Sequence, residues 1–318
     1  MGPIALAANA LAWLGRNGTR AVAVTIFLSL AVPQLSDLLR PLVGPSIFLL
    51  LILAFLRVEP SVFRGQFRGK QLWTLLAAVG FMMIVTPLAL GLLYSNIGSG
   101  ALWRELSFAL VLQAAAPPIM SAPAFAALLA LNVPLALAVL VSAIIFTPIG
   151  APLFAATFAG DTLPIDATSL ALRLAFFLGG SFVIARIIRH FTGDERIRAW
   201  REHINGLNVI ALFVFAASIM GIVTYTALSD PLLVLALLAL SFLIAFGLGG
   251  LTAGVFWALG RERALTIGVS AGMRNMGLML AAASGVSDTV WLYIAVAQLP
   301  IYLAPWLLQA IVQRILRP

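Results

Sequence analysis

The chain has 318 residues, of which 62% are hydrophobic and 9% are charged, and its mean hydropathy is +1.09. This composition lies far outside the range of soluble globular domains and, together with apolar runs along the whole chain, predicts an all-α integral membrane protein in the lipid bilayer. The formal net charge of +8 gives no reason to expect nucleic-acid binding, because the basic residues cluster in short loops between apolar runs.

The N-terminal residues 1–20 carry Arg16 and Arg20 after an apolar run and lack the basic start of a signal peptide. We expect them to form a short interfacial helix that is retained in the mature chain. The longest polar stretch, Arg186–Asn208, is expected to be a loop. Apolar runs predict ten membrane-spanning helices, at about 21–33, 41–57, 71–94, 106–131, 133–158, 167–190, 207–228, 231–259, 264–284 and 289–313.

The distribution of basic residues tests this arrangement. If the N-terminus is cytoplasmic, 15 of the 19 basic residues fall on the cytoplasmic side and only Arg40 and Arg104 fall on the opposite side. This asymmetry follows the positive-inside rule, so both termini are expected in the cytoplasm. Lys70 is the one lysine among the basic residues, a bias typical of GC-rich bacterial genomes, and the expected location is therefore a bacterial inner membrane.

The acidic residues and histidines argue against an enzyme. All 11 acidic residues lie in loops or at the ends of predicted spans, and His190 and His203 share one loop. An intramembrane aspartyl protease needs two membrane aspartates, a serine protease needs a base beside its serine, and a metallohydrolase needs metal ligands. No cofactor and no bound metal are predicted either.

Two of the predicted helices, the fourth and the ninth, contain helix-breaking residues at mid-depth. These residues are Pro117, Pro118, Pro123, Gly272 and Gly277. The polar pair Arg274 and Asn275 lies between the two glycines. A simple proline kink and close helix packing at glycine are the alternative explanations for these residues.

The two interruptions occupy equivalent places in two halves of five helices, at about 21–158 and about 167–314. Since five is odd, the second half is expected to be inverted relative to the first. Inverted repeats with paired discontinuous helices are typical of secondary transporters, which bind substrate where the breaks meet. Unwound backbone at that depth needs a protein or water-filled environment, and we expect Arg274 to share it.

Three segments then carry a family resemblance. They are LRVEPSVFRG after the second helix, the proline-broken fourth helix that continues into LALNVPLALAVLVSAIIFTPIGAPLF, and GMRNMGL in the ninth helix. In this order they make the chain similar to the bile acid:sodium symporter family over nearly its whole length. The resemblance implies ten helices in two inverted repeats, with helices four and nine crossing in a core domain that moves against a panel domain.

The chain departs from this family at the sodium ligands. The positions that match the ligands of sodium-coupled members are Ser270, Arg274, Ala122, Pro123, Ala136 and Leu140. The first two stand where the ninth-helix motif of those members carries a glutamate and a glutamine. A hard cation needs several oxygen ligands, preferably with a carboxylate. We therefore predict that the family's sodium sites do not function here.

Arg274 has three interpretations. Its guanidinium replaces bound sodium and neutralises the same backbone carbonyls, or it pairs with the carboxylate, sulfate or phosphonate of a substrate through bidentate hydrogen bonds. These two roles are compatible. The third interpretation is a surface position that is reached by snorkelling.

Other candidate substrate-binding residues flank the breaks. Asn275 is expected either to bind the substrate or to cap the half-helix that follows the break. Ser121 and Ser270 offer hydroxyl groups, although a serine within a span more often bonds its own helix. Met120 and Met273 either line an adaptable pocket for an apolar body or belong to the core.

These observations predict a secondary transporter of a small organic anion that works by alternating access without sodium. The alternatives are a sodium-coupled symporter with rearranged ligands, a carrier of the arsenite or auxin type, and a non-transporting membrane receptor of organic anions. No predicted span places a carboxylate or histidine at mid-depth to carry a proton. The expected modes are therefore facilitated diffusion, exchange, or efflux driven by the membrane potential. The substrate, the direction of transport and the oligomeric state do not follow from the sequence.

Overall fold

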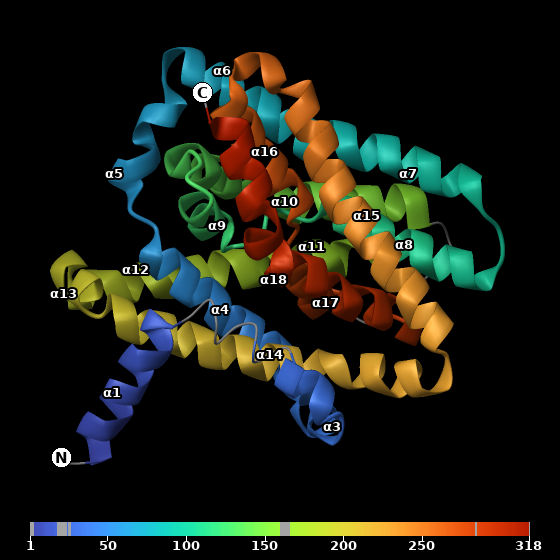
Figure 1. Cartoon of the computed structure of the whole chain (residues 1–318), viewed down its shortest axis with the longest axis horizontal. Helices are drawn as coiled ribbons and strands as arrows, with labels where there is room; N and C mark the ends of the chain where they lie inside the picture. The colour runs from blue at the N-terminus through green and yellow to red at the C-terminus, as the bar shows by residue number, and fades with distance from the viewer. Residues whose placement is uncertain (1–2, 18–23, 25–26, 160–165, 284, 318) are drawn as a thin grey trace. The chain divides into compact units, whose positions relative to one another are not determined.

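The computed structural model describes residues 3–17, 24, 27–159, 166–283 and 285–317 (Figure 1). The regular secondary structure among these residues is entirely helical, as a membrane protein of this class requires. Seven of the described helices are long and apolar enough to span a membrane. They are Gln34–Arg57, Gly69–Ile97, Val133–Phe158, Ala167–Thr192, Arg201–Ser229, Pro231–Val255 and Asp288–Leu316. The chain is thus a multi-pass α-helical membrane protein.

Three of the ten expected spans are not among these seven helices. The first, at 21–33, lies partly outside the described residues. The fourth and the ninth are each divided into two shorter helices. The ten-helix count therefore stays a prediction.

The described helices form two compact units, each built from two separated stretches of the chain. Unit 1 combines Met1–Val58 with Ala175–Val234, and unit 2 combines Glu59–Leu174 with Leu235–Pro318. This division is finer than the single transmembrane domain expected from the sequence.

Unit 1 is organised around its longest helix, α14. Its helices are α1 (Pro3–Arg16), α3 (Gln34–Leu39), α4 (Val43–Arg57), α12 (Ser181–Thr192), α13 (Asp194–Ala199) and α14 (Arg201–Ser229). A 3-10 helix at Arg40–Leu42 joins α3 to α4, and a π-helix at Phe176–Gly180 precedes α12. Figure 1 shows α4 beside α14, and α1 and α3 also pack on α14.

One sequence-based expectation for unit 1 needs correction. The stretch Arg186–Asn208 is not a loop, because it contains the end of α12, all of α13 and the start of α14. Its arginines and glutamates are good helix formers, so polarity alone did not mark a loop there. The N-terminal segment forms a helix, as expected, and this helix packs against α14 within unit 1.

Glycines allow α1 to approach α14 closely. A Cβ atom at Gly15 would lie 1.9 Å from the carbonyl oxygen of Glu202, and one at Gly206 would lie 2.0 Å from that of Leu11. Arg16 also forms an ion pair with Glu202 across this contact at 2.7 Å. Larger residues at the two glycines would push the helices apart.

Unit 2 holds both interrupted helices. Its helices are α5 (Pro60–Phe63), α6 (Gly69–Gly80), α7 (Thr86–Ile97), α8 (Ala101–Ala115), α9 (Ala122–Leu128), α10 (Val133–Ala159), α11 (Ala167–Ala175), α15 (Pro231–Val255), α16 (Arg261–Gly272), α17 (Met276–Ala282) and α18 (Asp288–Leu316). The short 3-10 helices Arg64–Phe67 and Trp257–Leu259 precede α6 and α16. A π-helix, η3 (Phe81–Val85), lies between α6 and α7.

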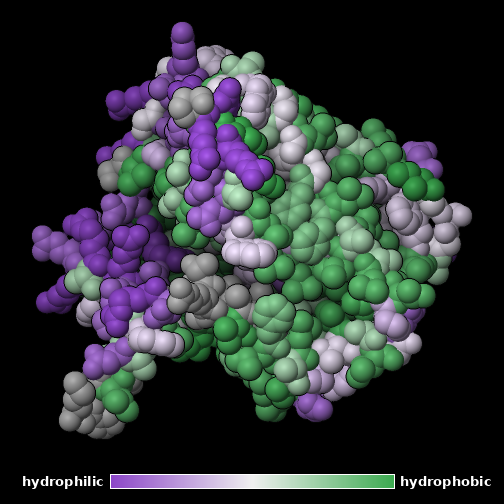
Figure 2. Space-filling view, viewed as in Figure 1, coloured by the Kyte–Doolittle hydropathy of each residue, from purple (hydrophilic) through white to green (hydrophobic). Residues whose placement is uncertain are grey.

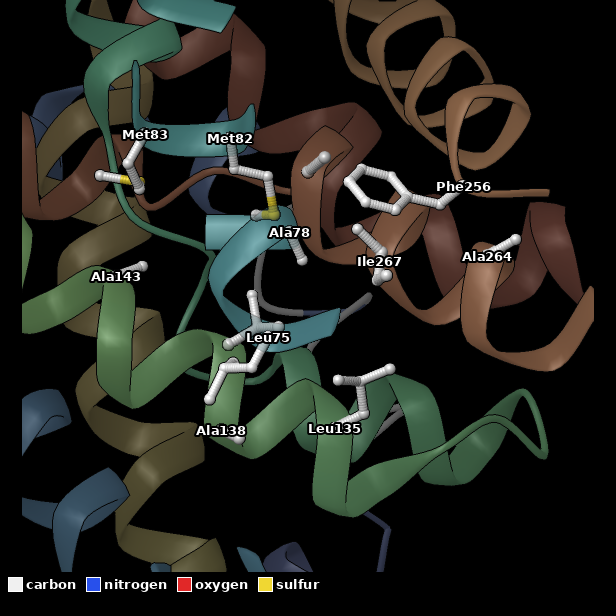
Figure 3. Packing of buried hydrophobic residues seen from close by; sticks show 12 residues of the cluster. Leu75, Ala78, Met82, Met83, Leu135, Ala138, Ala143, Phe256, Ala264 and Ile267 are labelled. Atoms are coloured by element: carbon white, nitrogen blue, oxygen red, sulfur yellow. The ribbon is translucent and has the colours of Figure 1, made fainter. Parts of the chain in front are cut away.

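The core of unit 2 brings α6, η3, α10 and α16 together. Figure 3 shows the apolar side chains that meet there, among them Leu75, Met82, Leu135 and Ile267. All four are at most 1% exposed. Figure 2 shows hydrophobic residues across much of one face, as lipid contact requires.

Candidate functional site

The two interrupted helices of unit 2 break at the residues that the sequence singles out. Helix α8 ends at Ala115, and the chain is extended at Ala116 before α9 begins at Ala122. Pro117 and Pro118 lie in this break, where their missing N–H groups leave no helical hydrogen bond unmade. Pro123 lies in the first turn of α9, a position that proline tolerates well.

The second break is shorter and meets the first. Helix α16 ends at Gly272, and α17 begins at Met276. An isolated antiparallel bridge pairs Pro118 with Arg274. The amide of Ile119 donates to the carbonyl of Met273 at 2.7 Å, and the amide of Asn275 donates to that of Pro117 at 2.8 Å. The unwound segments thus satisfy each other's backbone groups. We call this pair of segments, 116–121 and 273–275, the crossover.

Arg274 is fully buried at the crossover and bonds to backbone carbonyls. Its Nε donates to the carbonyl of Ala271 at 2.6 Å, Nη1 donates to that of Ala116 at 2.8 Å, and Nη2 donates to that of Met82 at 3.1 Å. The sulfur of Met83 lies 3.8 Å from Nη1. The side chain is 0% exposed, so the snorkelling interpretation does not describe this structure. These four partners, three carbonyl oxygens and one thioether sulfur, are all neutral groups.

Each of the three carbonyls is available for a physical reason. Ala271 lies in the last turn of α16 and Ala116 directly follows α8, where helical carbonyls lack an N–H partner. Met82 lies in η3, whose widened turn disturbs the usual hydrogen-bond ladder. The C-terminal ends of α8 and α16 carry partial negative charge. The guanidinium is therefore stabilised by helix ends in place of a carboxylate.

Asn275 and Ser270 bond to their own part of the chain. The Oδ1 atom of Asn275 accepts a hydrogen bond from the amide of Leu278 at 3.1 Å and so caps α17. Of the two expected roles of Asn275, capping is the one seen in the structure. The hydroxyl of Ser270 donates to the carbonyl of Thr266 at 2.9 Å, and the side chain is 1% exposed.

The remaining expected site residues divide by exposure. Met120 and Ser121 are half-buried at the start of α9, and Ser121 makes no capping hydrogen bond there. Met273 is buried in the second break, and Gly277 is buried in α17. Met120 and Ser121 are therefore the candidate substrate contacts that solvent or a ligand reaches.

The positions that the resemblance noted above matches to sodium ligands offer few side-chain oxygens to a hard cation. Ala122, Ala136 and Leu140 are at most 2% exposed and provide no side-chain oxygen. Among the described residues, no group of three or more His, Cys, Asp or Glu side chains could hold a metal ion. The carbonyls near the crossover that could bind a cation instead bind the guanidinium of Arg274.

Helix α15 packs closely against α16 and so fixes the position of the end of α16, where the second break begins. A Cβ atom at Gly272 would lie 2.3 Å from the carbonyl oxygen of Ala245, and one at Gly268 would lie 2.5 Å from that of Gly249. Glycine at 272 therefore serves helix contact as well as termination of α16.

Sequence reasoning missed several polar contacts around the crossover. The hydroxyl of Tyr293 in α18 donates to Oε1 of Gln113, which lies in the last turn of α8. The amide of Asn132 donates to the hydroxyl of Thr266 at 3.1 Å and joins the start of α10 to α16. Each of these residues stands alone among apolar neighbours, so no spacing pattern marks the pairs.

The carbonyl of Met82 was also missed as a partner of Arg274, although Thr86 and Pro87 provided a local signal of the irregular helix turn at Phe81–Val85. Proline at 87 removes the amide that would bond to the carbonyl of Met83, and the hydroxyl of Thr86 donates to the carbonyl of Phe81 at 2.9 Å.

Comparison with known proteins adds no further assignment, because no protein-family model and no curated protein matches this chain.

Proposed function

We propose that the chain is a secondary transporter of a small organic anion, that it works by alternating access, and that it needs no sodium. The observation that carries the proposal is the crossover, where two interrupted helices exchange backbone hydrogen bonds around a buried arginine. Paired discontinuous helices are a costly arrangement in a membrane and are typical of transporters. The resemblance of GMRNMGL to the bile acid:sodium symporter family supports the same reading.

The contacts of Arg274 favour its role as a replacement for sodium. Its three nitrogens donate to three carbonyls, and no part of the side chain is exposed to a substrate. A tethered guanidinium supplies positive charge to the ends of α8 and α16 without a free ion. Because this charge cannot leave the protein, an inward sodium gradient has no ion to drive through the site.

The anion itself is expected to bind at the accessible end of the crossover, at 120–121, and not on Arg274. Met120 and Ser121 are accessible there and could contact an apolar body and a polar group, respectively. Efflux of an anion from a negative-inside cell is favoured by about 2.3 kcal/mol per charge per 100 mV. The expected modes are therefore exchange and voltage-driven efflux.

Thermal stability in detergent is the first test of this proposal. The melting temperature of the wild type is measured in sodium chloride and in potassium chloride at equal ionic strength. A ligand that binds only the folded state raises stability by RT ln(1 + [L]/Kd), so a working sodium site gives a concentration-dependent, sodium-specific shift. We expect equal melting temperatures in both salts. A sodium-specific rise would instead indicate a symporter with rearranged ligands.

Transport is then tested in proteoliposomes. Vesicles loaded with one of a panel of organic carboxylates and sulfonates are assayed for counterflow of the labelled anion, in sodium and in potassium. We expect counterflow at the same rate in both salts, and a lower rate in Ser121→Ala if this residue contacts the anion. Saturable anion binding without counterflow would overturn the transport proposal and indicate a receptor.

A further inference from the structure

A second surface, in unit 1, combines exposed arginines with exposed aromatic side chains. It covers residues 186–201, from the end of α12 through α13 to the first residue of α14, and we call it the basic corner. Figure 2 shows hydrophilic residues gathered around α13, at the left of the view. Within this polar region, Phe191 is 81% exposed and Trp200 is 52% exposed. Exposed aromatic side chains that lie beside exposed arginines are candidates for an interaction surface.

The backbone explains why the basic corner faces outward. Gly193 has a positive φ of 81°, which ends α12 and redirects the chain into α13. Ile197 is buried in an apolar cluster with Ile52, Leu56 and Ala185 and holds α13 against the body of unit 1. Arg196 and Arg198 flank this buried residue and are exposed.

The corner carries an excess of positive charge. Near the corner, Arg16 forms an ion pair with Glu202, and Arg189 forms one with Asp194. The exposed arginines of the corner that take part in neither pair are Arg186, Arg196, Arg198 and Arg201. Glu195 is the one acidic residue of the corner outside these pairs, so four guanidinium groups face a single carboxylate.

The corner is also continuous with an apolar surface. Helix α12 exposes Val183 and Ile187 as well as Phe191, and lipid is the surrounding that suits such side chains on a membrane helix. Arg186 and Arg189 lie on this same helix, and Arg196 and Arg198 follow directly in α13. The exposed apolar side chains of α12 suit the acyl chains of a phospholipid, and the arginines suit its headgroup phosphate.

We propose that the basic corner binds the headgroups of anionic phospholipids, with Phe191 and Trp200 lying at the membrane interface. Clustered basic residues next to a membrane helix attract anionic lipids, and amphipathic aromatic residues favour the headgroup level. The guanidinium group suits a phosphate because it donates two parallel hydrogen bonds. This inference does not depend on transport.

The test uses the full chain in nanodiscs of phosphatidylcholine with increasing fractions of phosphatidylglycerol. We expect phosphatidylglycerol to raise the melting temperature of the wild type. In the triple variant R186Q/R196Q/R198Q, we expect a rise that is smaller by at least about threefold, because each basic residue near an anionic surface contributes to lipid attraction. The matched control is R64Q/R68Q/K70Q, which removes the same charge from exposed residues of unit 2.

Three outcomes would overturn the proposal. They are a wild type that does not respond to phosphatidylglycerol, a control variant that loses as much of the response as the corner variant, and an equal rise with free inorganic phosphate in phosphatidylcholine alone. The last outcome would indicate a site for free anions. If the glutamine variant does not fold, two further variants replace it. R186K/R196K/R198K keeps the positive charge and is expected to retain most of the stabilisation by phosphatidylglycerol. R186A/R196A removes two of the charges, and full retention of the stabilisation in this variant would count against the proposal.

Discussion

Arg274 in unit 2 and Arg189 in unit 1 perform the same task in different surroundings. Both donate to carbonyls at the ends of helices: Arg274 to Ala116 and Ala271, and Arg189 through Nη2 to Leu56 and to Val58. Arg189 also pairs with the carboxylate of Asp194 at 3.2 Å, and 15% of its side chain is exposed. Arg274 is fully buried, and the groups that its guanidinium contacts are carbonyls and a thioether sulfur.

This difference teaches what a buried guanidinium needs. At the edge of unit 1, water and a carboxylate share the charge, so no single carbonyl is decisive. Inside unit 2, three carbonyls and two helix ends must compensate the whole charge. The crossover geometry is therefore expected to depend on Arg274 far more than the corner of unit 1 depends on Arg189.

The largest expected effect comes from Arg274→Gln. The substitution leaves the carbonyls of Met82, Ala116 and Ala271 without a charged donor, and we expect a loss of about 3–5 kcal/mol of stability. The measurement is the melting temperature of the purified protein in detergent, with exposed Arg173→Gln as the control. A variant that melts with the wild type would break the comparison, because the carbonyls would then have other partners.

Gly272→Ala is the next largest change and perturbs the crossover without touching its charge. The new Cβ atom would meet the carbonyl of Ala245 at 2.3 Å, and overpacking of this kind typically costs about 1–3 kcal/mol. Gly250→Ala is the matched control, because no heavy atom lies within 4 Å of its Cβ position. We expect the control to melt at or above the wild-type temperature, and equal destabilisation of both variants would contradict the packing argument.

Arg189→Gln is expected to cost less, about 1–2 kcal/mol, because water can reach the carbonyls of Leu56 and Val58 when the guanidinium is removed. Asp194→Asn should cost still less, since an exposed ion pair typically contributes about 0–1 kcal/mol. Both melting temperatures are compared with that of Arg274→Gln under the same conditions. A loss for Arg189→Gln as large as that for Arg274→Gln would remove the distinction between the two regions.

The smallest effect concerns Asp166, which caps α11. Hydrogen bonds from the backbone amides of Ser169 and Thr168 lower the pKa of this exposed carboxyl group. A lowered folded-state pKa gives stability that is present above the unfolded value of about 3.9 and is lost as the pH falls through the folded value. Wild type and Asp166→Asn should therefore differ slightly at neutral pH and converge in acid. A difference that grows on acidification would have the wrong sign.

The sequence predicted the breaks of the crossover well, because their causes are local. Proline at 117 and 118 cannot continue a helix, and α8 ends at Ala115. Arg274 between glycines was expected in a protein or water-filled environment at the second break, with snorkelling as an alternative, and the side chain is fully buried there. Both conclusions rest on single residues. A proline interrupts the hydrogen bonds of a membrane helix, and an arginine at mid-depth must be shielded from the lipid.

The partners of Arg274 could not be predicted in the same way. The carbonyl of Met82 becomes available through a π-helix about 190 positions earlier in the chain. Every residue has a backbone carbonyl, so a hydrogen bond to one leaves no pattern of residue types in the sequence. The extent of α14 was missed because arginine and glutamate suit both helices and loops, and only its packing against α1 and α4 decides between them.

The interleaving of the two units has a consequence for biosynthesis. Helix α4 is complete at Arg57, but its main partner in unit 1, α14, begins only at Arg201. At translation rates of about 5–20 residues per second, α4 waits on the order of ten seconds for this partner to be synthesised. The whole first stretch of unit 2, Glu59–Leu174, is synthesised during that interval. Newly made α3 and α4 thus depend on the lipid or on the insertion machinery for temporary contacts, and a chain that stalls before Arg201 is a natural substrate for quality-control proteases.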